Sequence, residues 1–481
     1  MAIRIDGGIV VGWSGTHHEL IYDGTVLIDG NRISYAGPKR SLPADRVIDA
    51  GRQLICPGFI NLHIHSQLNI GDYLLTDVSR KDYYTANYFV FGAPAKGKKG
   101  PLTPADAAIE CEYALFSALK NGSTTILDTG GPLTDWEAYV EIVGRTGGRV
   151  FFGPRFRSSD LFTDEKGRFD YRERPDKGRS AFEAALAFIE KYHGRHNGRM
   201  QGFLNPAQAE TCQPELLRDT LAAAKDLNVG IHIHAGGNFR EFFRILDTYR
   251  RTIVEYLADC GLLRPRTVLG HMVFIDRHSL VNYPGSNDLK LMGEAQVSIG
   301  HCAHKYAKMA MAMESFDRYL DRGINVGLGT DTYPLDIIAE MRYASLISRL
   351  VDRNAAGARA AAVFNAATIG GARALGKKDL GRLEAGALAD IVIVDLRNTR
   401  YGPVRDPITA LVEYASGADV KTVIVDGDIV INDGVSQRVD EDDLYLKAEE
   451  VDRKAWDHWA EKDWAKRTTE EIVPPAFPTR T

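Results

Sequence analysis

The first 56 residues consist of short β-rich segments separated by tight-turn signals. Runs such as IRIDGGIVV and LIYDGTVLIDGNRISYAG combine apolar and β-branched residues with glycine, aspartate and asparagine at the turns. The same pattern returns near the end of the chain in GALADIVIVDLRN and KTVIVDGDIVINDG. Because such short strands bury little apolar surface alone, we expect residues 1–56 and 376–436 to combine into one small β-sandwich domain.

Between these ends, residues 57–375 alternate short apolar runs with amphipathic helical patterns. This alternation is typical of βα units around a parallel sheet. Eight such units in a segment of this length suit a (β/α)8 TIM barrel, so the predicted fold class is α/β. The predicted barrel strands are residues 59–65, 124–128, 150–153, 200–204, 230–234, 267–271, 296–301 and 325–331.

The last segment, residues 437–481, is highly charged, with spaced leucine, valine and tryptophan. This spacing predicts a C-terminal helical tail with one apolar face, which lies on the body of the protein or on a neighbouring subunit. We also expect the protein to be a homo-oligomer.

Charge and composition exclude several classes of partner. Of the 481 residues 44% are hydrophobic and 26% charged, and the net charge is −5, so neither nucleic acid nor a membrane is an expected partner. The N-terminus lacks the pattern of a secretory signal. The five cysteines form no CxxC pair, which argues against disulfides and a cysteine zinc site, and we interpret Cys302 as a buried structural thiol. We expect a cytoplasmic enzyme that acts on a small molecule.

Histidine and aspartate follow the predicted barrel strands. His-x-His pairs end the first and fifth strands, and single residues end the sixth, seventh and eighth. The carboxyl ends of barrel strands meet at one face, so these side chains should share a pocket. Alternate residues of a strand point to the same side, which directs both histidines of a pair inward. Imidazoles with a carboxylate suit one divalent metal ion, Zn²⁺, Fe²⁺, Co²⁺ or Mn²⁺, and this ligand set does not select among the four. The residues concerned are His63, His65, His232, His234, His271, His301 and Asp331.

Seven motifs in order carry a family resemblance. They are PGFINLHIHS, GSTTILDTG, HIHAGG, GHMVFID, HCAHKYAKM, GLGTDTYP and GRLEAGALADIVIVD. Together they resemble the amidohydrolase superfamily, in its chlorohydrolase and cytosine-deaminase-like branch. The resemblance covers nearly the whole chain and implies a metal-dependent barrel with a composite β-sandwich.

The resemblance also implies roles for individual residues. It implies that His63, His65, His234 and Asp331 bind the metal, and that His271 polarises the substrate or orients the attacking water. His232, Asn205 and His304 are additional candidates for the site.

Two positions depart from the family pattern. The glutamate that usually follows the strand-five ligand by three residues, and that passes protons to a ring nitrogen, is Gly237 here. The lysine that bridges two metals in binuclear members is replaced by Asn205, which argues against a second metal. An asparagine at this place resembles the phenylurea and molinate hydrolases of the superfamily.

These features predict a metal-dependent hydrolase of a small urea, carbamate, thiocarbamate or amide. We expect a metal-bound hydroxide to attack the substrate and to cleave a C–N or C–S bond. Asp331 would shuttle the proton, His271 would stabilise the oxyanion, and His301 or His304 would act at the leaving group. Two alternatives stay open: a deaminase or dechlorinase of a nitrogen heterocycle, and a non-catalytic barrel scaffold.

Overall fold

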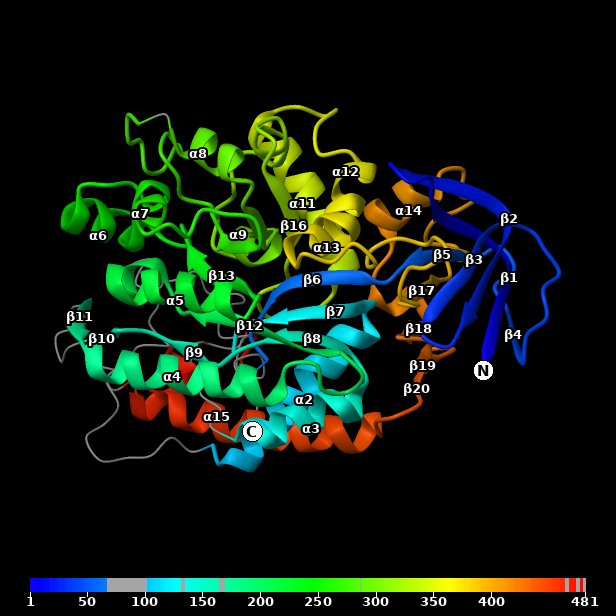
Figure 1. Ribbon diagram of the computed structural model, residues 1–481, viewed down its shortest axis with the longest axis horizontal. Helices are drawn as coiled ribbons and strands as arrows, with labels where there is room; N and C mark the ends of the chain where they lie inside the picture. The colour runs from blue at the N-terminus through cyan, green and yellow to red at the C-terminus, as the bar shows by residue number, and fades with distance from the viewer. Residues whose placement is uncertain are drawn as a thin grey trace.

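A parallel barrel and a mixed sheet lie side by side in the protein (Figure 1). The computed structural model describes residues 1–66, 102–130, 135–163, 169–285, 287–462, 467–472 and 476–478. The barrel strands run in the order β6 to β16 around the sheet, each parallel to the next. They are β6 (Phe59–Ile64), β7 (Ser123–Asp128), β8 (Arg149–Phe152), β12 (Met200–Pro206), β13 (Gly230–Ala235), β14 (Thr267–His271), β15 (Ser298–His301) and β16 (Asn325–Leu328).

The eighth strand closes the barrel onto the first just beyond its own end. Asp331 pairs with Ile64 in an isolated parallel bridge. The amide of Asp331 donates to the carbonyl of His63 at 2.8 Å, and the amide of His65 donates to the carbonyl of Asp331 at 3.0 Å. The expected eight-stranded parallel barrel is therefore confirmed as nearly closed, and its closure places Asp331 beside both histidines of the first strand.

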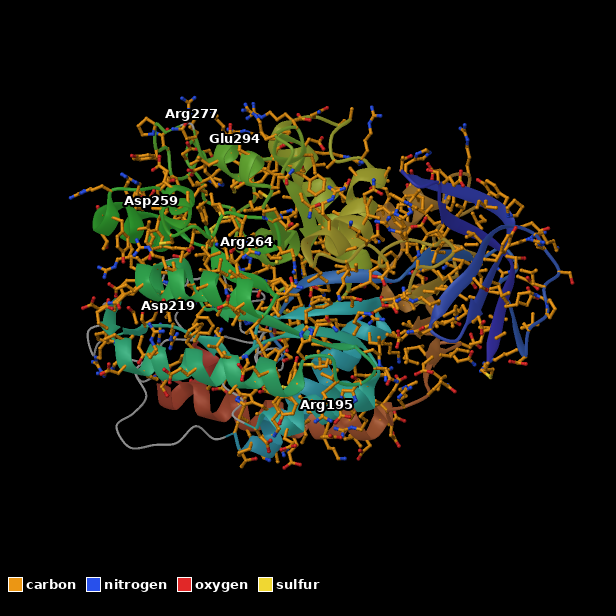
Figure 2. The ribbon with its side chains drawn as sticks, in the orientation of Figure 1. Arg195, Asp219, Asp259, Arg264, Arg277 and Glu294 are labelled. Atoms are coloured by element: carbon orange, nitrogen blue, oxygen red, sulfur yellow. The ribbon has the colours of Figure 1, made fainter. Side chains whose placement is uncertain are left out.

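Helices cover the outside of the barrel, as amphipathic segments between parallel strands require. Charged residues on them, such as Asp219, Asp259 and Glu294, lie at the outer surface (Figure 2). The helices between barrel strands and after the last one are α2 (Pro104–Lys120), α3 (Trp136–Thr146), α4 (Pro175–Tyr192), α5 (Pro214–Asp226), α6 (Phe239–Tyr249), α7 (Ile253–Asp259), α8 (Asp288–Ala295), α9 (Ala303–Lys308), α10 (Phe316–Leu320), α11 (Ile337–Asp352), α12 (Ala360–Asn365) and α13 (Gly371–Ala374).

Smaller elements occupy the loops. The strand β9 (Arg155–Phe156) pairs with β12, and β10 (Ser159–Thr163) forms a hairpin with β11 (Phe169–Glu173). Short helical turns are η2 (Ala209–Thr211), η3 (Ala366–Gly370) and η4 (Gly417–Asp419), and the helix α14 (Pro407–Tyr414) follows β17.

The two ends of the chain meet in one mixed sheet. Its order is β20-β19-β18-β17-β5-β1-β2-β3, with β4 added beside β1. The antiparallel pairing of β17 with β5 joins the C-terminal strands to the N-terminal ones. The described strands form a single sheet, so the second layer of the predicted sandwich is not confirmed. They are β1 (Ala2–Trp13), β2 (His18–Asp29), β3 (Arg32–Pro38), β4 (Arg46–Asp49), β5 (Leu54–Pro57), β17 (Ile391–Val394), β18 (Val420–Val425), β19 (Asp428–Asn432) and β20 (Val435–Ser436).

The C-terminal helix α15 (Glu441–Lys462) packs along α2 (Figure 1). Ala448 and Val451 are buried against α2, and Lys454 Nζ lies 3.1 Å from a carboxylate oxygen of Asp106. The tail thus lies on the body of the protein, one of the two positions expected from its pattern. A short helix, α16 (Thr469–Ile472), follows. Within the described part of the chain, we find no helix that is both long and apolar enough to span a membrane.

Candidate metal centre

The predicted site residues gather at the carboxyl ends of the barrel strands. His63 is on β6 and His65 follows it directly, His232 and His234 are on β13, and His271 ends β14. All of these side chains are buried, as are His301 and Asp331. Because the pleat sends alternate residues to one side, each His-x-His pair presents both rings to the barrel interior.

Asp331 lies at the centre of this cluster. Its carboxylate oxygens lie 3.5 Å from His65 Nε2, 3.5 Å from His271 Nε2 and 3.9 Å from His63 Nε2. Potential ligand atoms of His63, His65 and Asp331 lie within 4.8 Å of one another, and those of His63, His234 and His271 form a second such group. The four predicted ligands are therefore close enough to share one ion, although their assignment as ligands stays a prediction.

Hydrogen bonds fix the protonation of two imidazoles. His234 Nδ1 lies 2.6 Å from the carbonyl oxygen of Ala207, which can only accept, so this nitrogen carries the proton. Thr129 donates its hydroxyl proton to the carbonyl of Ile64 and so accepts from His65 Nδ1 at 2.9 Å. Both Nε2 atoms are left with lone pairs, and they face each other at 3.1 Å.

A second chain of hydrogen bonds fixes the proton of His63. The side-chain amide of Asn205 donates to the carbonyls of Thr129 and Gly153, which turns its oxygen toward His232 Nδ1 at 3.2 Å. His232 must donate there, so its Nε2 accepts from His63 Nδ1 at 2.9 Å. His63 Nε2 is then unprotonated, and within the described part of the chain it has no hydrogen-bond partner.

Three Nε2 lone pairs and one carboxylate thus converge on one point. Two nitrogen ligands on one tetrahedral zinc ion lie about 3.3 Å apart, close to the separation of His65 from His234. Without a cation, lone pairs at that distance repel each other. Burial lowers the pKa of His65 to about 4 and that of His232 to about 3, and it lowers the pKa of His63 and His234 well below the usual value, so neutral ligands are present at pH 7. The donor set fits a divalent metal ion.

Two glycines leave room for this arrangement. A Cβ on Gly270 would stand 2.9 Å from both His232 Nε2 and His63 Nδ1, where the two rings hydrogen-bond. A Cβ on Gly329 would stand 2.6 Å from the Cβ of His63. Since real Cβ atoms do not approach other atoms so closely, β14 and the residue that follows β16 both need glycine here.

Three residues of the site were not predicted as functional. Lys305 Nζ lies 2.5 Å from Asp331 Oδ2. Burial alone would raise the pKa of Asp331, but Lys305 more than offsets this and the pKa is lowered to about 2. Tyr306 packs its ring edge-on against His271, with centroids 5.2 Å apart. Cys302 is buried, as expected, and its sulfur belongs to a group of potential ligand atoms with His271 and Asp331.

His301 and His304 are placed less directly. His301 is buried at the end of β15, and its Nδ1 has no hydrogen-bond partner, but it does not belong to the potential ligand groups among the described residues. His304 stacks on Tyr343 with ring centroids 4.4 Å apart, and its backbone amide donates to Glu340. His304, one of the two residues predicted to act at the leaving group, is thus held against the helix α11.

A buried carboxyl group lies beside Gly237, where the family glutamate is missing. Glu241 Oε2 accepts the Gly237 amide at 2.8 Å and lies 3.8 Å from the point where a Cβ on Gly237 would stand. That point is 3.2 Å from the ring of His271. Burial and the nearby carboxyl of Glu210 raise the pKa of Glu241 well above its usual value, which favours the protonated form. Sequence reasoning missed Glu241 because it lies four residues beyond the family position, on α6.

Comparison with known proteins identifies the family. The model of the amidohydrolase family matches residues 54–430. A 5-methylthioadenosine/S-adenosylhomocysteine deaminase from Pyrococcus abyssi is 29% identical over 94% of this chain and 99% of its own. A 5'-deoxyadenosine deaminase from Methanothermobacter thermautotrophicus is 31% identical over 87% of this chain and 91% of its own.

Solved structures agree with the fold. Atrazine chlorohydrolase from Arthrobacter aurescens, complexed with zinc, superposes with a TM-score of 0.78 at 24% identity, over 94% of this chain and all of the other. An adenosine deaminase from Xanthomonas campestris with bound zinc gives 0.79 at 21% identity, over 94% and 98%. The chain therefore belongs to the amidohydrolase family and is a hydrolytic enzyme that acts on carbon–nitrogen bonds.

Proposed function

We propose that this enzyme hydrolyses an exocyclic C–N bond, or a related bond, at a ring carbon of a small nitrogen heterocycle. From the sequence alone, this reaction is one of the two alternatives to hydrolysis of a urea, carbamate, thiocarbamate or amide. The names of the relatives support it, since two that align over most of the chain are deaminases of adenosine derivatives. No scaffold role is favoured, because every predicted metal ligand is present.

The metal ligands of the proposal are His63, His65, His234 and Asp331. A divalent ion held by them would acidify a coordinated water and polarise the substrate. Asp331 Oδ2 is ionised and close to His271, so the carboxylate accepts the proton of the attacking water and delivers it to the leaving nitrogen. The neutral imidazole of His271 donates a hydrogen bond to the negative charge that develops on the substrate.

The carboxyl group of Glu241 is the observation that carries the choice of a ring substrate. Addition of water to a ring carbon requires protonation of the adjacent ring nitrogen. Gly237 cannot supply a proton, but a Cβ at Gly237 would stand 3.8 Å from Glu241 Oε2 and 3.2 Å from the ring of His271, and burial favours the protonated form of Glu241. Its Oε1 has no hydrogen-bond partner among the residues that the structure describes. We therefore assign the role of ring acid to Glu241.

A substitution that keeps shape and charge tests this assignment. Because burial favours the neutral, protonated form of Glu241, Glu241→Gln preserves the neutrality of the side chain and its acceptor for the Gly237 amide. We expect this variant to lose at least 100-fold in kcat on amino-purines and amino-triazines, while its metal content stays unchanged. The release of ammonia measures the rate. The matched control is Glu110→Gln, which alters a different buried carboxyl, on α2. Its kcat should stay within about two-fold of that of the unmodified enzyme. Full ring activity in Glu241→Gln would refute the proposal.

A second candidate is hydrolysis of an acyclic urea or carbamate, which Gly237 favours. A carbonyl carbon already carries a polarised oxygen and has less need of a ring acid. Assays of phenylureas and thiocarbamates separate the two reactions. Their turnover is measured as release of the amine. If these substrates turn over and the ring amines do not, and Glu241→Gln leaves the rate unchanged, the second candidate is correct.

A further inference from the structure

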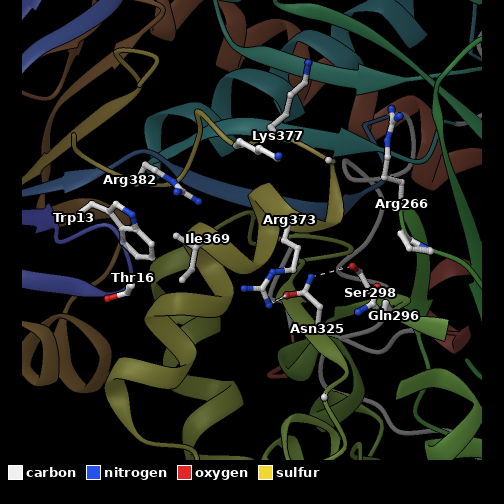
Figure 3. A pocket seen from close by; sticks show the side chains of 14 residues that line it. Trp13, Thr16, Arg266, Gln296, Ser298, Asn325, Ile369, Arg373, Lys377 and Arg382 are labelled. Atoms are coloured by element: carbon white, nitrogen blue, oxygen red, sulfur yellow. Dashed lines mark hydrogen bonds between the residues drawn. The ribbon is translucent and has the colours of Figure 1, made fainter. Parts of the chain in front are cut away.

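A basic cavity lies at the end of the barrel opposite the histidines. It is lined by residues at the amino ends of barrel strands, including Arg266 just before β14 and Asn325 at the start of β16. The turn after β1 forms another wall, and the segment around α13 forms the third. The cavity has a volume of about 600 Å³ (Figure 3).

Five of the fourteen lining residues are cationic, and none is acidic. This is a strong local excess in a chain in which Asp and Glu outnumber Lys and Arg by 64 to 59. Figure 3 labels Arg266, Arg373, Lys377 and Arg382 around the cavity. The five are Arg266, Arg373, Lys377, Lys378 and Arg382.

Neutral groups orient three of these cations without cancelling their charge. Arg266 donates to the side-chain oxygen of Asn228 at 2.8 Å, and Arg373 donates to that of Asn325 at 3.4 Å. Lys377 donates to the side-chain oxygen of Gln201 at 3.2 Å. Bringing like charges together in this way costs free energy unless a counter-charge is present.

Two acidic groups lie close to the cavity cations, Glu384 and Asp379. Arg382 lies over the ring of Trp13 at 4.6 Å and reaches Glu384 at 3.6 Å. Asp379 pairs with Arg32 at 2.8 Å on the mixed sheet. Glu384 and Asp379, which also interacts with Lys377, therefore offset the five cations only in part, and the cavity keeps a net positive charge.

We propose that this cavity binds a small polyphosphate-bearing anion, at a site separate from the metal centre. Guanidinium groups match phosphate oxygens through paired N–H donors, and lysine adds point charges. The volume exceeds what one orthophosphate fills and suits a ligand with several phosphates, such as inorganic triphosphate or a nucleoside triphosphate. Because Trp13 of β1 lines the same cavity as Arg266 and Asn325 of the barrel, a bound anion links the mixed sheet to the barrel.

Binding to the full-length enzyme tests the proposal. Orthophosphate, triphosphate and ATP are titrated by calorimetry at matched ionic strength, and thermal unfolding is recorded in parallel. We expect saturable binding of triphosphate or ATP, at least ten-fold tighter than that of orthophosphate, together with a raised Tm. Equal affinities for triphosphate and ATP identify the phosphate chain as the ligand, and tighter binding of ATP adds the nucleoside. Metal content is measured after each titration, because polyphosphates chelate metals.

Variants at exposed positions locate the site. The double variant Arg373→Gln/Lys378→Gln should weaken binding at least ten-fold while circular dichroism and basal hydrolysis stay unchanged. The control pair, Lys290→Gln/Arg353→Gln, removes two exposed cations outside the cavity and should bind as the unmodified enzyme does. No saturable binding by the unmodified enzyme, or equal binding by both double variants, would overturn the proposal.

Discussion

The ammonium group of Lys305 lies 2.5 Å from Asp331 Oδ2. Asp331 is the carboxylate to which we assign both metal binding and proton transfer, so a cation on α9 contacts the group on which the proposed chemistry depends. We predict that Lys305→Met lowers kcat/KM by about 10- to 100-fold with metal content retained, because the carboxylate loses its charged partner. Lys308→Met, at a neighbouring lysine that donates to the carbonyl of Tyr333, is the control and should have little effect. Equal losses in both variants would show that Lys305 has no specific role.

Asp331 itself gives the sharpest loss. Asp331→Asn removes the ionised carboxylate and the proton acceptor but preserves the size of the side chain. We expect kcat to fall by several orders of magnitude, measured as product release under saturating substrate. Turnover near that of the unmodified enzyme would remove Asp331 from the mechanism.

The amide of Asn205 should set metal affinity from a distance. Its oxygen fixes the tautomer of His232, and His232 in turn fixes that of His63. Asn205→Ala breaks this chain, so we predict a 10- to 100-fold loss of metal affinity, measured by competition with a chelator. Asn432→Ala, on the mixed sheet, is the control. Unchanged affinity in Asn205→Ala would limit the asparagine to a structural role in β12.

The buried carboxyl of Glu110 predicts a pH dependence of stability. Burial, with a smaller contribution from Asp106, raises its pKa to about 8. Between an unfolded pKa of about 4.3 and this value the folded state binds more protons than the unfolded state, so this group makes stability fall as pH rises. Glu110→Gln removes this term and should add roughly 4 kcal/mol at pH 8, with little effect at pH 4.5. Thermal unfolding followed at several pH values measures the difference, and identical pH profiles would contradict the prediction.

The site residues that could be predicted from the sequence are those whose position is determined by their own strand. His63, His65, His232 and His234 could be predicted because the pleat of a strand and the common end of a barrel decide where they point. Glu241, Lys305 and Tyr306 could not, since they lie on helices whose approach to the centre depends on the packing of the whole barrel. The relay through Asn205 also required the orientation of an amide that no spacing reveals.

The small domain shows the same limit on a larger scale. Its short strands were predicted from their turns, but the number of layers depends on which strands pair. The contact of β17 with β5 places both ends of the chain in one sheet, and no local pattern encodes a pairing over so long a separation.

That pairing also determines when the molecule can be completed during synthesis. A ribosome that has made β5 must add roughly 330 further residues before β17 emerges. Although β5 can pair with β1, its other edge therefore stays exposed throughout translation of the barrel. A single residue, Gly58, separates β5 from the strand β6, which carries His63. Translation that stops early would therefore leave the metal centre attached to an open, aggregation-prone edge, even with every ligand already made.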